Sequence, residues 1–276
     1  MCETCGCNIT PGNVSLAQQP VSAGQTTVEV LENLLHANDH AAGHNREHFE
    51  RHGVLAVNLM SSPGSGKTAL LEATIEALGE RLRVAVIEGD LETENDAQRI
   101  RAKGVPAIQI TTGTACHLDA HLVHDALHHL PLADLDVVFI ENVGNLVCPA
   151  SFDLGHHLSV TLLSVTEGDD KPAKYPVMFR GSDVVVVTKT DVAPYFEDFD
   201  TARVEAHVRA LACEAPVLEA SVRSPGGIDA WLDWLKTMRT RFAQGERFSG
   251  AIERNPPAHT HPHGHHHHHG HEHESR

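Results

Sequence analysis

The sequence predicts an α/β fold, a doubly wound, mostly parallel sheet with helices on both faces. The first observation is that apolar runs of strand length recur at 54–60, 84–87 and 184–187, which is typical of strands buried on both faces. The second is that amphipathic stretches of helical length separate these runs. The third is that carboxylates follow several runs, where parallel strands end and face the ligand crevice.

Composition narrows the class of protein. The 276 residues suffice for one domain with appendages or two small domains. The net charge of −16 argues against a surface that binds nucleic acid. No apolar run is long enough to span a membrane and no signal-peptide pattern opens the chain, so we expect a cytoplasmic protein. Six cysteines and 23 histidines then indicate metal or redox chemistry rather than structural disulfides.

The N-terminus carries the first candidate metal site. Cys2, Cys5 and Cys7 can converge on one ion, one ligand short of a closed tetrahedral shell. Such an incomplete site suits a metal that is passed on, and a tail of exposed thiols is the alternative. The pattern does not choose Zn²⁺ over Ni²⁺. Residues 8–25 follow as a linker rich in Pro, Gly, Ser and Gln.

A helix is predicted next, over residues 27–49. Four histidines share one of its faces because they are spaced four residues apart: His36, His40, His44 and His48. Weak metal buffering and a solvated polar face are both open interpretations. Gly43 suggests a break in this helix.

Residues 61–68 read as a phosphate-binding loop between a strand and the helix 69–78. Glycines let the backbone approach a triphosphate, Lys67 reaches the β- and γ-phosphates, and the Thr68 hydroxyl holds Mg²⁺. Ser61 departs from the pattern, which has glycine there, and a plain strand-to-helix turn is the alternative. The predicted nucleotide ligands of this loop are Gly64, Ser65, Gly66, Lys67 and Thr68.

Two later strands end in acids. Asp90 follows the strand 83–87 and is placed to touch Mg²⁺, its waters or the attacking water, or else to cap the helix that begins near Glu94. Glu141 ends the strand 136–140 in the Walker B arrangement, which positions Mg²⁺. Gly144 beyond it allows the backbone to move when a γ-phosphate is present.

A second candidate metal site combines two loops. Cys116 and His117 are predicted at the start of a helix running to about His129, and Cys148 follows Glu141 by seven residues. A lone Cys-His pair is more often packing than a site. If the loops are neighbours, however, the three side chains form a set beside the nucleotide, and a two-fold partner could complete the shell.

Residues 188–191, Thr-Lys-Thr-Asp, match the guanine-reading pattern N-K-x-D with Thr in place of Asn. The Asp191 carboxylate can accept from two guanine N–H groups, and the stem of Lys189 can lie over the base. A helix cap at Asp191 is the alternative.

The sequence after this motif predicts helices over 202–212 and 227–242, with Cys213 as a packing residue. The last residues form a His-rich tail, for which two interpretations are open: native metal storage and an affinity tag.

Jointly, the thiol motif, the phosphate loop, Ala-Cys-His-Leu-Asp-Ala at 115–120, Glu-Asn-Val-Gly-Asn-Leu-Val-Cys-Pro at 141–149 and the guanine motif resemble the HypB family of nickel-incorporation GTPases, which help mature [NiFe] hydrogenase. The resemblance implies a tight nickel site at Cys2, Cys5 and Cys7. It also implies a weaker site in the GTPase domain, at the dimer interface, formed by Cys116, His117 and Cys148. Asp90 would lie in the first switch, and Asp191 would select guanine.

The expected protein therefore hydrolyses GTP, with Lys67 and Asp90 as catalytic residues and Thr68, Asp90 and Glu141 around Mg²⁺. The nucleotide state would control homodimerisation and the binding of Ni²⁺ or Zn²⁺. Partners would be a nickel-delivery protein and the [NiFe] hydrogenase large-subunit precursor. Expected divisions are a cysteine motif and linker (1–25), a P-loop GTPase domain with its N-terminal helix (26–245) and a disordered His-rich tail (246–276). The alternatives are a urease-type nickel GTPase, a metabolic phosphotransferase and a passive nickel or zinc storage protein.

Overall fold

The computed structural model describes residues 27–90, 94–113 and 115–248. The thiol motif of Cys2, Cys5 and Cys7 and the histidines of the tail lie outside the described residues, as do the predicted linker and the end of the tail segment. Among the described helices, none has the length and apolar character needed to cross a membrane.

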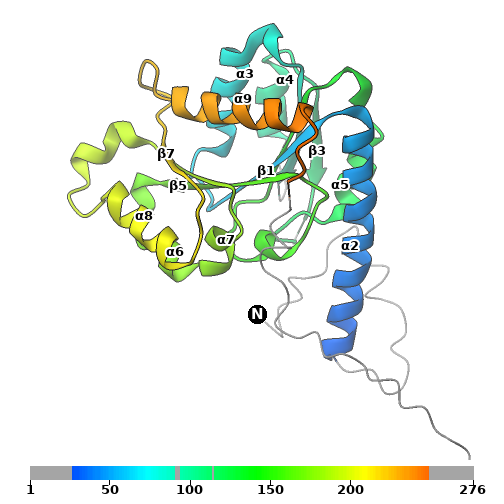
Figure 1. Cartoon of the computed structure of the whole chain (residues 1–276), viewed down its shortest axis with the longest axis horizontal. Helices are drawn as coiled ribbons and strands as arrows, with labels where there is room; N and C mark the ends of the chain where they lie inside the picture. The colour runs from blue at the N-terminus through cyan, green and yellow to red at the C-terminus, as the bar shows by residue number, and fades with distance from the viewer. Residues whose placement is uncertain (1–26, 91–93, 114, 249–276) are drawn as a thin grey trace, which may run out of the picture.

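One seven-stranded sheet forms the centre of the molecule, in the order β3-β2-β4-β1-β5-β6-β7 (Figure 1). Every neighbouring pair in it is parallel. The strands are β1 (Leu55–Ser61), β2 (Val84–Asp90), β3 (Ala107–Thr111), β4 (Val137–Glu141), β5 (Leu158–Ser164), β6 (Val184–Thr188) and β7 (Val217–Glu219). The predicted doubly wound sheet is thereby confirmed, and it is wholly parallel in the part of the chain described.

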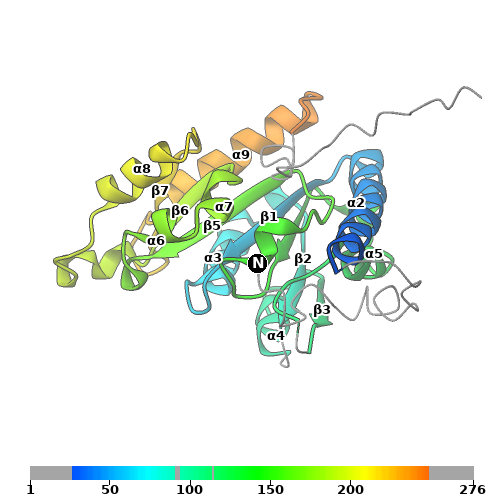
Figure 2. The same cartoon turned by 90° about the horizontal axis from the view of Figure 1, so that it is seen from below.

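Helices cover both faces of the sheet (Figures 1 and 2). They are α2 (Thr27–His52), α3 (Lys67–Leu78), α4 (Asn95–Arg101), α5 (Ala120–Leu127), α6 (Lys171–Lys174), α7 (Pro176–Arg180), α8 (Thr201–Ala210) and α9 (Asp229–Ala243). Short 3₁₀ turns are η1 (Gly79–Arg81), η2 (Leu132–Asp134), η3 (Cys148–Ser151), η4 (Val165–Glu167) and η5 (Thr190–Tyr195).

The alternation of side chains along β1 divides the core into layers. Val57 and Leu59 belong to a cluster with α3, α4 and α9, whereas Ala56 packs with α2 and α5. Met60 packs with α7 and α8 on the same side as Ala56. Because successive side chains of a strand point to opposite faces, a strand that is apolar at every position buries both of them.

Helix α2 differs from the sequence-based expectation. It runs unbroken through Gly43, where a break was predicted. A glycine inside a helix costs only about 1 kcal/mol. Packing of Ala41 and Ala42 against Ala120 of α5 offsets that cost. The expected helix start at Cys116 is also wrong, since α5 begins at Ala120 and Asp119 caps it by accepting from the Leu122 N–H.

The strand order defines where a ligand can bind. In the strand order, β2, which follows β1 in the chain, lies on one side of β1, and β5, which follows β4, lies on the other side of β1. Crevices of open α/β sheets form at such a reversal, outside the carboxyl ends of the strands. The loops after β1 and β4, which carry the phosphate-loop and Walker B motifs, therefore lie side by side.

Candidate nucleotide site and metal centre

The phosphate loop joins β1 to α3 and is shaped by two glycines. Gly64 and Gly66 have φ angles of 76° and 94°, a left-handed conformation that residues with a Cβ rarely adopt. Gly66 is the N-cap of α3, so Lys67 and Thr68 open the helix. The first N–H groups of that helix and its dipole then face the crevice, and this arrangement favours a phosphate.

The backbone conformation of Ser61 explains why this position does not need the glycine of the usual phosphate-loop pattern. It is the last residue of β1 and fully buried, and its φ is not in the left-handed region. Position 61 therefore does not require glycine. The Ser61 hydroxyl accepts a hydrogen bond from Lys67 Nζ at 3.0 Å, which holds the lysine side chain inside the loop.

Acidic side chains share the cavity that the phosphate loop lines. One oxygen from each of Glu88, Asp96 and Glu141 lies within 4.8 Å of the others. Thr68 Oγ1 donates to Glu141 Oε1 at 2.8 Å. Asp90 lines the same cavity of about 370 Å³, together with Lys67 and Thr68.

The protonation behaviour of these acids follows from their burial. Burial, reinforced by repulsion from Glu141, raises the pKa of Glu88 to about 11. Burial also raises the pKa of Glu141, against the opposing attraction of Lys67. The Oε2 atoms of Glu88 and Glu141 are buried and find no hydrogen-bond partner among the described residues. Two close acids, each with one oxygen that lacks a hydrogen-bond partner, lie beside a threonine hydroxyl and fit a hard cation such as Mg²⁺.

Sequence reasoning missed Glu88 and Asp96. The signal for Glu88 was the strand register, since Glu88 of β2 pairs directly with Glu141 of β4. No local pattern marks Asp96, which enters the site because α4 begins just beyond the end of β2.

A second cavity, of about 320 Å³, adjoins the phosphate loop and contains Lys189 and Asp191. Gly66 and Ala69 line both cavities, so a triphosphate and an attached base could occupy them together. Asp191 Oδ1 accepts from Ser221 Oγ at 2.8 Å, which orients the carboxylate. This cavity suits a planar base with adjacent N–H donors.

The same motif is fastened to the phosphate loop. Thr188 Oγ1 donates to the Ser65 carbonyl at 2.6 Å, and Lys189 Nζ donates to the Gly64 carbonyl at 2.7 Å. Lys189 has a left-handed φ of 59°, which turns the chain toward the loop. Threonine in place of asparagine therefore retains a donor that joins the two motifs.

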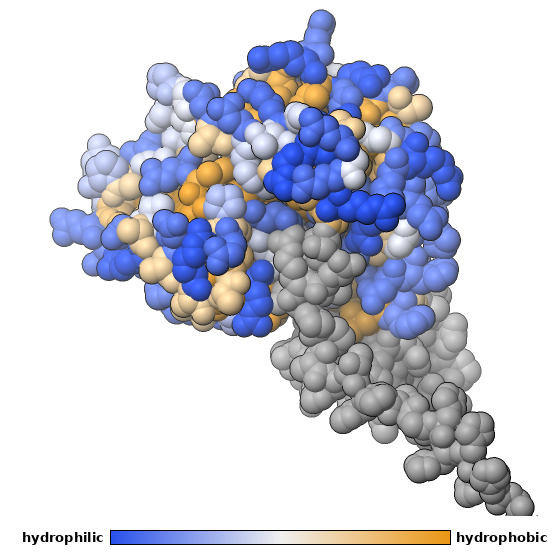
Figure 3. All heavy atoms as spheres, viewed as in Figure 1, coloured by the Kyte–Doolittle hydropathy of each residue, from blue (hydrophilic) through white to orange (hydrophobic). Residues whose placement is uncertain are grey.

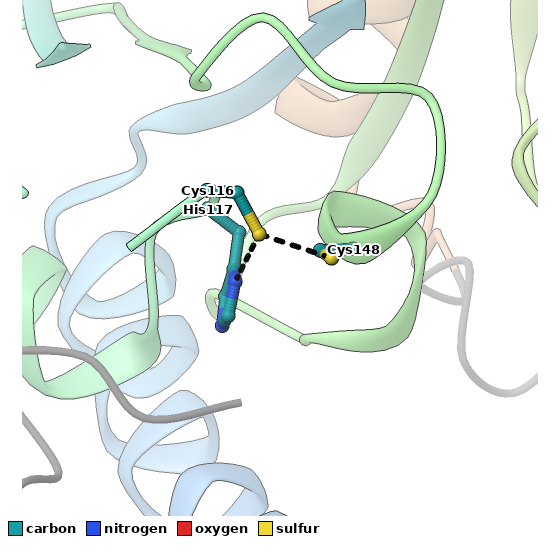
Figure 4. Close-up of side chains that lie close together, drawn as sticks. All are labelled: Cys116, His117 and Cys148. Atoms are coloured by element: carbon teal, nitrogen blue, oxygen red, sulfur yellow. Dashed lines mark hydrogen bonds between the residues drawn. The ribbon is translucent and has the colours of Figure 1, made fainter. Parts of the chain in front are cut away.

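The candidate metal centre brings Cys116, His117 and Cys148 together (Figure 4). Cys116 Sγ lies 3.1 Å from Cys148 Sγ and 3.8 Å from His117 Nδ1. His117 is fully buried and stacks on Phe152, with 4.0 Å between the ring centroids. The two loops are neighbours, as the sequence-based hypothesis required.

The electrostatics of this cluster favour an added cation. Burial lowers the pKa of His117 to about 4, so the imidazole is neutral near pH 7 and has a lone pair for a metal. Burial, with the adjacent Cys116, raises the pKa of Cys148 to about 11. A divalent ion would reverse that shift, because metal-bound thiols lose their protons.

The loop 142–148 connects the two sites. Gly144 lies so close to Pro63 that an added Cβ would be 2.8 Å from the Pro63 Cα. Asn145 Nδ2 donates to the Cys116 carbonyl at 3.3 Å, and Asn142 Oδ1 accepts from the Leu118 N–H at 3.1 Å. The loop thus contacts both the phosphate loop and the segment that carries Cys116. The two asparagines were not singled out from the sequence.

Comparison with known proteins agrees with this arrangement. Residues 55–219 match the family model of the CobW/HypB/UreG nucleotide-binding domain. The hydrogenase maturation factor HypB of Azotobacter vinelandii is 49% identical over 81% of this chain and 73% of its own length. The protein of the same name from Escherichia coli (strain K12) is 49% identical over 80% of this chain and 76% of its own.

Solved structures give the same result. HypB from Helicobacter pylori, crystallised in complex with nickel, superposes with a TM-score of 0.72 at 40% identity, covering 77% of this chain and 98% of that one. HypB from Archaeoglobus fulgidus superposes with a TM-score of 0.69 at 38% identity, covering 74% and 100% of the two chains. The resemblance that the motifs predicted is confirmed, and the chain belongs to the HypB family of hydrogenase maturation factors.

Proposed function

We propose that this chain is a GTP-hydrolysing nickel metallochaperone that helps insert nickel into [NiFe] hydrogenase. The observation that carries the proposal is the loop 142–148, which contacts the phosphate loop through Gly144 and the Cys116 segment through Asn145. A γ-phosphate that moves this loop would move ligands of the metal centre. Couplings of this kind typically amount to about 1–3 kcal/mol.

The proposed hydrolysis depends on positioned charge. Lys67 and the N–H groups of the phosphate loop would stabilise the negative charge that develops on the phosphoryl oxygens. Thr68, Glu141 and Asp90 would hold Mg²⁺ or its waters, and Glu88 joins them because it faces the same cavity. When bound, Mg²⁺ supplies charge that neutralises the phosphates. Asp90 would orient the attacking water, and Asp191 would select guanine.

The proposed cargo ion is Ni²⁺, with Zn²⁺ as a competing ion at the same ligands. Cys116, His117 and Cys148 supply three ligands, and three ligands leave a tetrahedral shell open. A second copy of the chain would fill the open position, so metal binding and homodimerisation would support each other. The complex of Helicobacter pylori HypB with nickel supports the choice of ion. Cys2, Cys5 and Cys7 would form the tighter site.

The proposed site of action of this chain is the cytoplasm, and its proposed partners are a nickel-delivery protein and the precursor of the [NiFe] hydrogenase large subunit. A second candidate is service to urease. Relatives from two Helicobacter species, 43% and 41% identical to this chain, bear the name hydrogenase/urease maturation factor. We favour hydrogenase because the relatives at 49% identity are named for hydrogenase alone.

The test is a nickel titration of the full chain with GDP and with a non-hydrolysable GTP analogue, with the dimer fraction measured by sedimentation. We expect nickel affinity to differ between the two nucleotides by about 5–150-fold, the usual range of such coupling. Cys148→Ser should remove the difference and Cys213→Ser should not, because Cys213 is buried in the apolar core. Equal affinity and an equal dimer fraction in both nucleotide states would reject the proposal.

A further inference from the structure

Three histidines gather where α2 packs against α5, apart from the residues of the proposed nickel centre. His48 lies on α2, and His124 and His128 lie one turn apart at the end of α5. Their ring centroids are 4.8 Å apart for His124–His128, 5.7 Å for His48–His124 and 6.4 Å for His48–His128. We call His48, His124 and His128 the interhelical cluster. His128 is exposed and His48 and His124 are partly buried. Figure 3 shows a largely hydrophilic surface over α2.

The spacing of His124 to His128 and to His48 is close to that of imidazoles around one ion. With metal–nitrogen bonds of about 2.1 Å and tetrahedral angles, ring centroids should be roughly 5 Å apart. Two of the three distances lie close to this value. The widest, His48–His128, is too long for the three rings to form a ligand set as they stand. An ion shared by all three therefore requires rotation of His128, which is exposed at the C-cap of α5.

A buried asparagine fixes the orientation of His124. Asn45 is fully buried, and its Nδ2 donates to the carbonyls of Ala120 and Leu154 at 2.8 and 3.1 Å. Its Oδ1 must therefore accept, and it lies 2.9 Å from His124 Nδ1. That contact places the proton on Nδ1 and leaves a lone pair on Nε2. Metal-binding histidines are held in this way, with the second ring nitrogen donating to a fixed acceptor.

The surroundings also favour the neutral forms of His48 and His124. The pKa of His48 is lowered by partial burial and by Arg51, His128 and other cationic neighbours. The pKa of His124 is lowered by partial burial and by His128 and His48. A capping role for a protonated His128 at the end of α5 is the competing explanation, because helix C-termini favour cations. That role does not account for the approach of His48 and His124 or for the contact that fixes the His124 ring.

We propose that the interhelical cluster is a metal site for a first-row divalent cation that prefers imidazole, such as Ni²⁺ or Zn²⁺. His48, His124 and His128 supply the ligands, Asn45 positions His124, and water completes the shell. His44, one turn before His48 on α2, is a candidate for a fourth ligand. An ion here joins α2 to α5 and stabilises their packing. The site goes beyond the proposed function and requires neither nucleotide nor cysteine.

The test is hydrogen exchange of the full chain, read on peptides covering 44–52 and 120–130, with Ni²⁺ as the probe. Binding to the folded state slows exchange in the elements that the ion joins. We expect Ni²⁺ to slow exchange of both peptides in the wild type and in Cys148→Ser. The double variant His124→Gln/His128→Gln should require at least about tenfold more Ni²⁺ for the same protection. His128→Gln alone, at an exposed position, gives a second variant that should fold normally.

A matched control removes two histidines outside the cluster. His36→Gln/His129→Gln changes two exposed positions and should retain the wild-type response. Protection that persists in His124→Gln/His128→Gln, or that is absent from the wild type, overturns the site. Protection lost in Cys148→Ser would assign the effect to the proposed nickel centre instead. A nickel titration that fails to distinguish GDP from GTP would affect only the proposed function.

Discussion

The two edges of the central sheet treat charge in opposite ways. At the carboxyl edge, Glu88 and Glu141 are buried together with raised pKa values. At the amino edge, the acid just before β4 is paired: Asp136 accepts from Arg83 Nε at 3.1 Å and from Arg239 at 3.3 Å. The acid just before β6, Asp183, accepts from the Ser159 N–H at 2.7 Å.

This comparison indicates that acids at the carboxyl edge serve ligand binding, whereas acids at the amino edge serve the stability of the fold. Paired groups at the amino edge stabilise the fold without a ligand. Crowded carboxylates at the carboxyl edge cost stability until a cation compensates them, which is typical of sites whose groups are arranged for a ligand. Substitutions at the two edges should therefore have opposite effects on ligand binding and on unfolding.

The largest effect should come from Lys67→Ala at the carboxyl edge. Removing the cation of the phosphate loop should lower GTP hydrolysis by at least about 100-fold, as for other groups that stabilise transition-state charge. Phosphate release measured at saturating GTP checks this. Residual activity within tenfold of the wild type would contradict the proposed role.

At the amino edge, His157 should make stability depend on pH. Burial lowers its pKa to about 3, and its Nδ1 accepts from the Ala56 N–H at 3.0 Å, so it is neutral in the folded chain. The unfolded chain binds a proton below about pH 6.5, and the folded chain does not. Stability should therefore fall as the pH drops, by up to about 2 kcal/mol between pH 6.5 and 5.

Urea unfolding of the wild type and His157→Gln over this range measures the slope. The variant should lose less stability on acidification. Equal slopes in the two proteins would show that His157 can be protonated in the folded state.

Glu88→Gln at the carboxyl edge should separate metal-free stability from ligand binding most clearly. Glutamine resembles the protonated acid, so stability without metal should be unchanged or higher. Affinity for the Mg²⁺–GTP complex should fall about tenfold, because one carboxylate near the cation is lost. Unfolding in EDTA and nucleotide titrations with and without Mg²⁺ give the two numbers, and a large loss of metal-free stability would contradict this view of Glu88.

Asp136→Asn at the amino edge should give the smallest effect and the reverse pattern. It weakens contacts with Arg83 and Arg239, and solvent screening at this partly exposed position limits the loss to about 1 kcal/mol. GTP affinity and hydrolysis should be unchanged. A loss of nucleotide affinity here would show that the two edges are not independent.

The features that could be predicted from the sequence are those marked by short local patterns. Apolar strands, the phosphate loop and the Walker B acid each follow from short patterns, and β1 with its following turn and helix appeared as expected. Pairing between distant strands was not visible in this way. Glu88 becomes a site residue only through its register with Glu141, and Asn145 only because its loop returns to Cys116.

Local pattern also misjudged two helices. Gly43 was expected to break α2, but contacts with a helix more than 70 residues away override a weak propensity. Cys116 and His117 were expected to be helical, but Asp119 caps α5 after them and leaves both residues in a loop. That loop allows both side chains to turn toward Cys148.

The contact between Ser61 and Lys67 has a consequence for how fast nucleotide can be captured. A long, flexible lysine usually loses rotational freedom on meeting its anion, but here the side chain is already ordered before the encounter. An arriving phosphate exchanges a neutral hydroxyl acceptor for a charged one and incurs little further loss of entropy. Ser61→Gly, although it restores the common motif, should therefore slow GTP association.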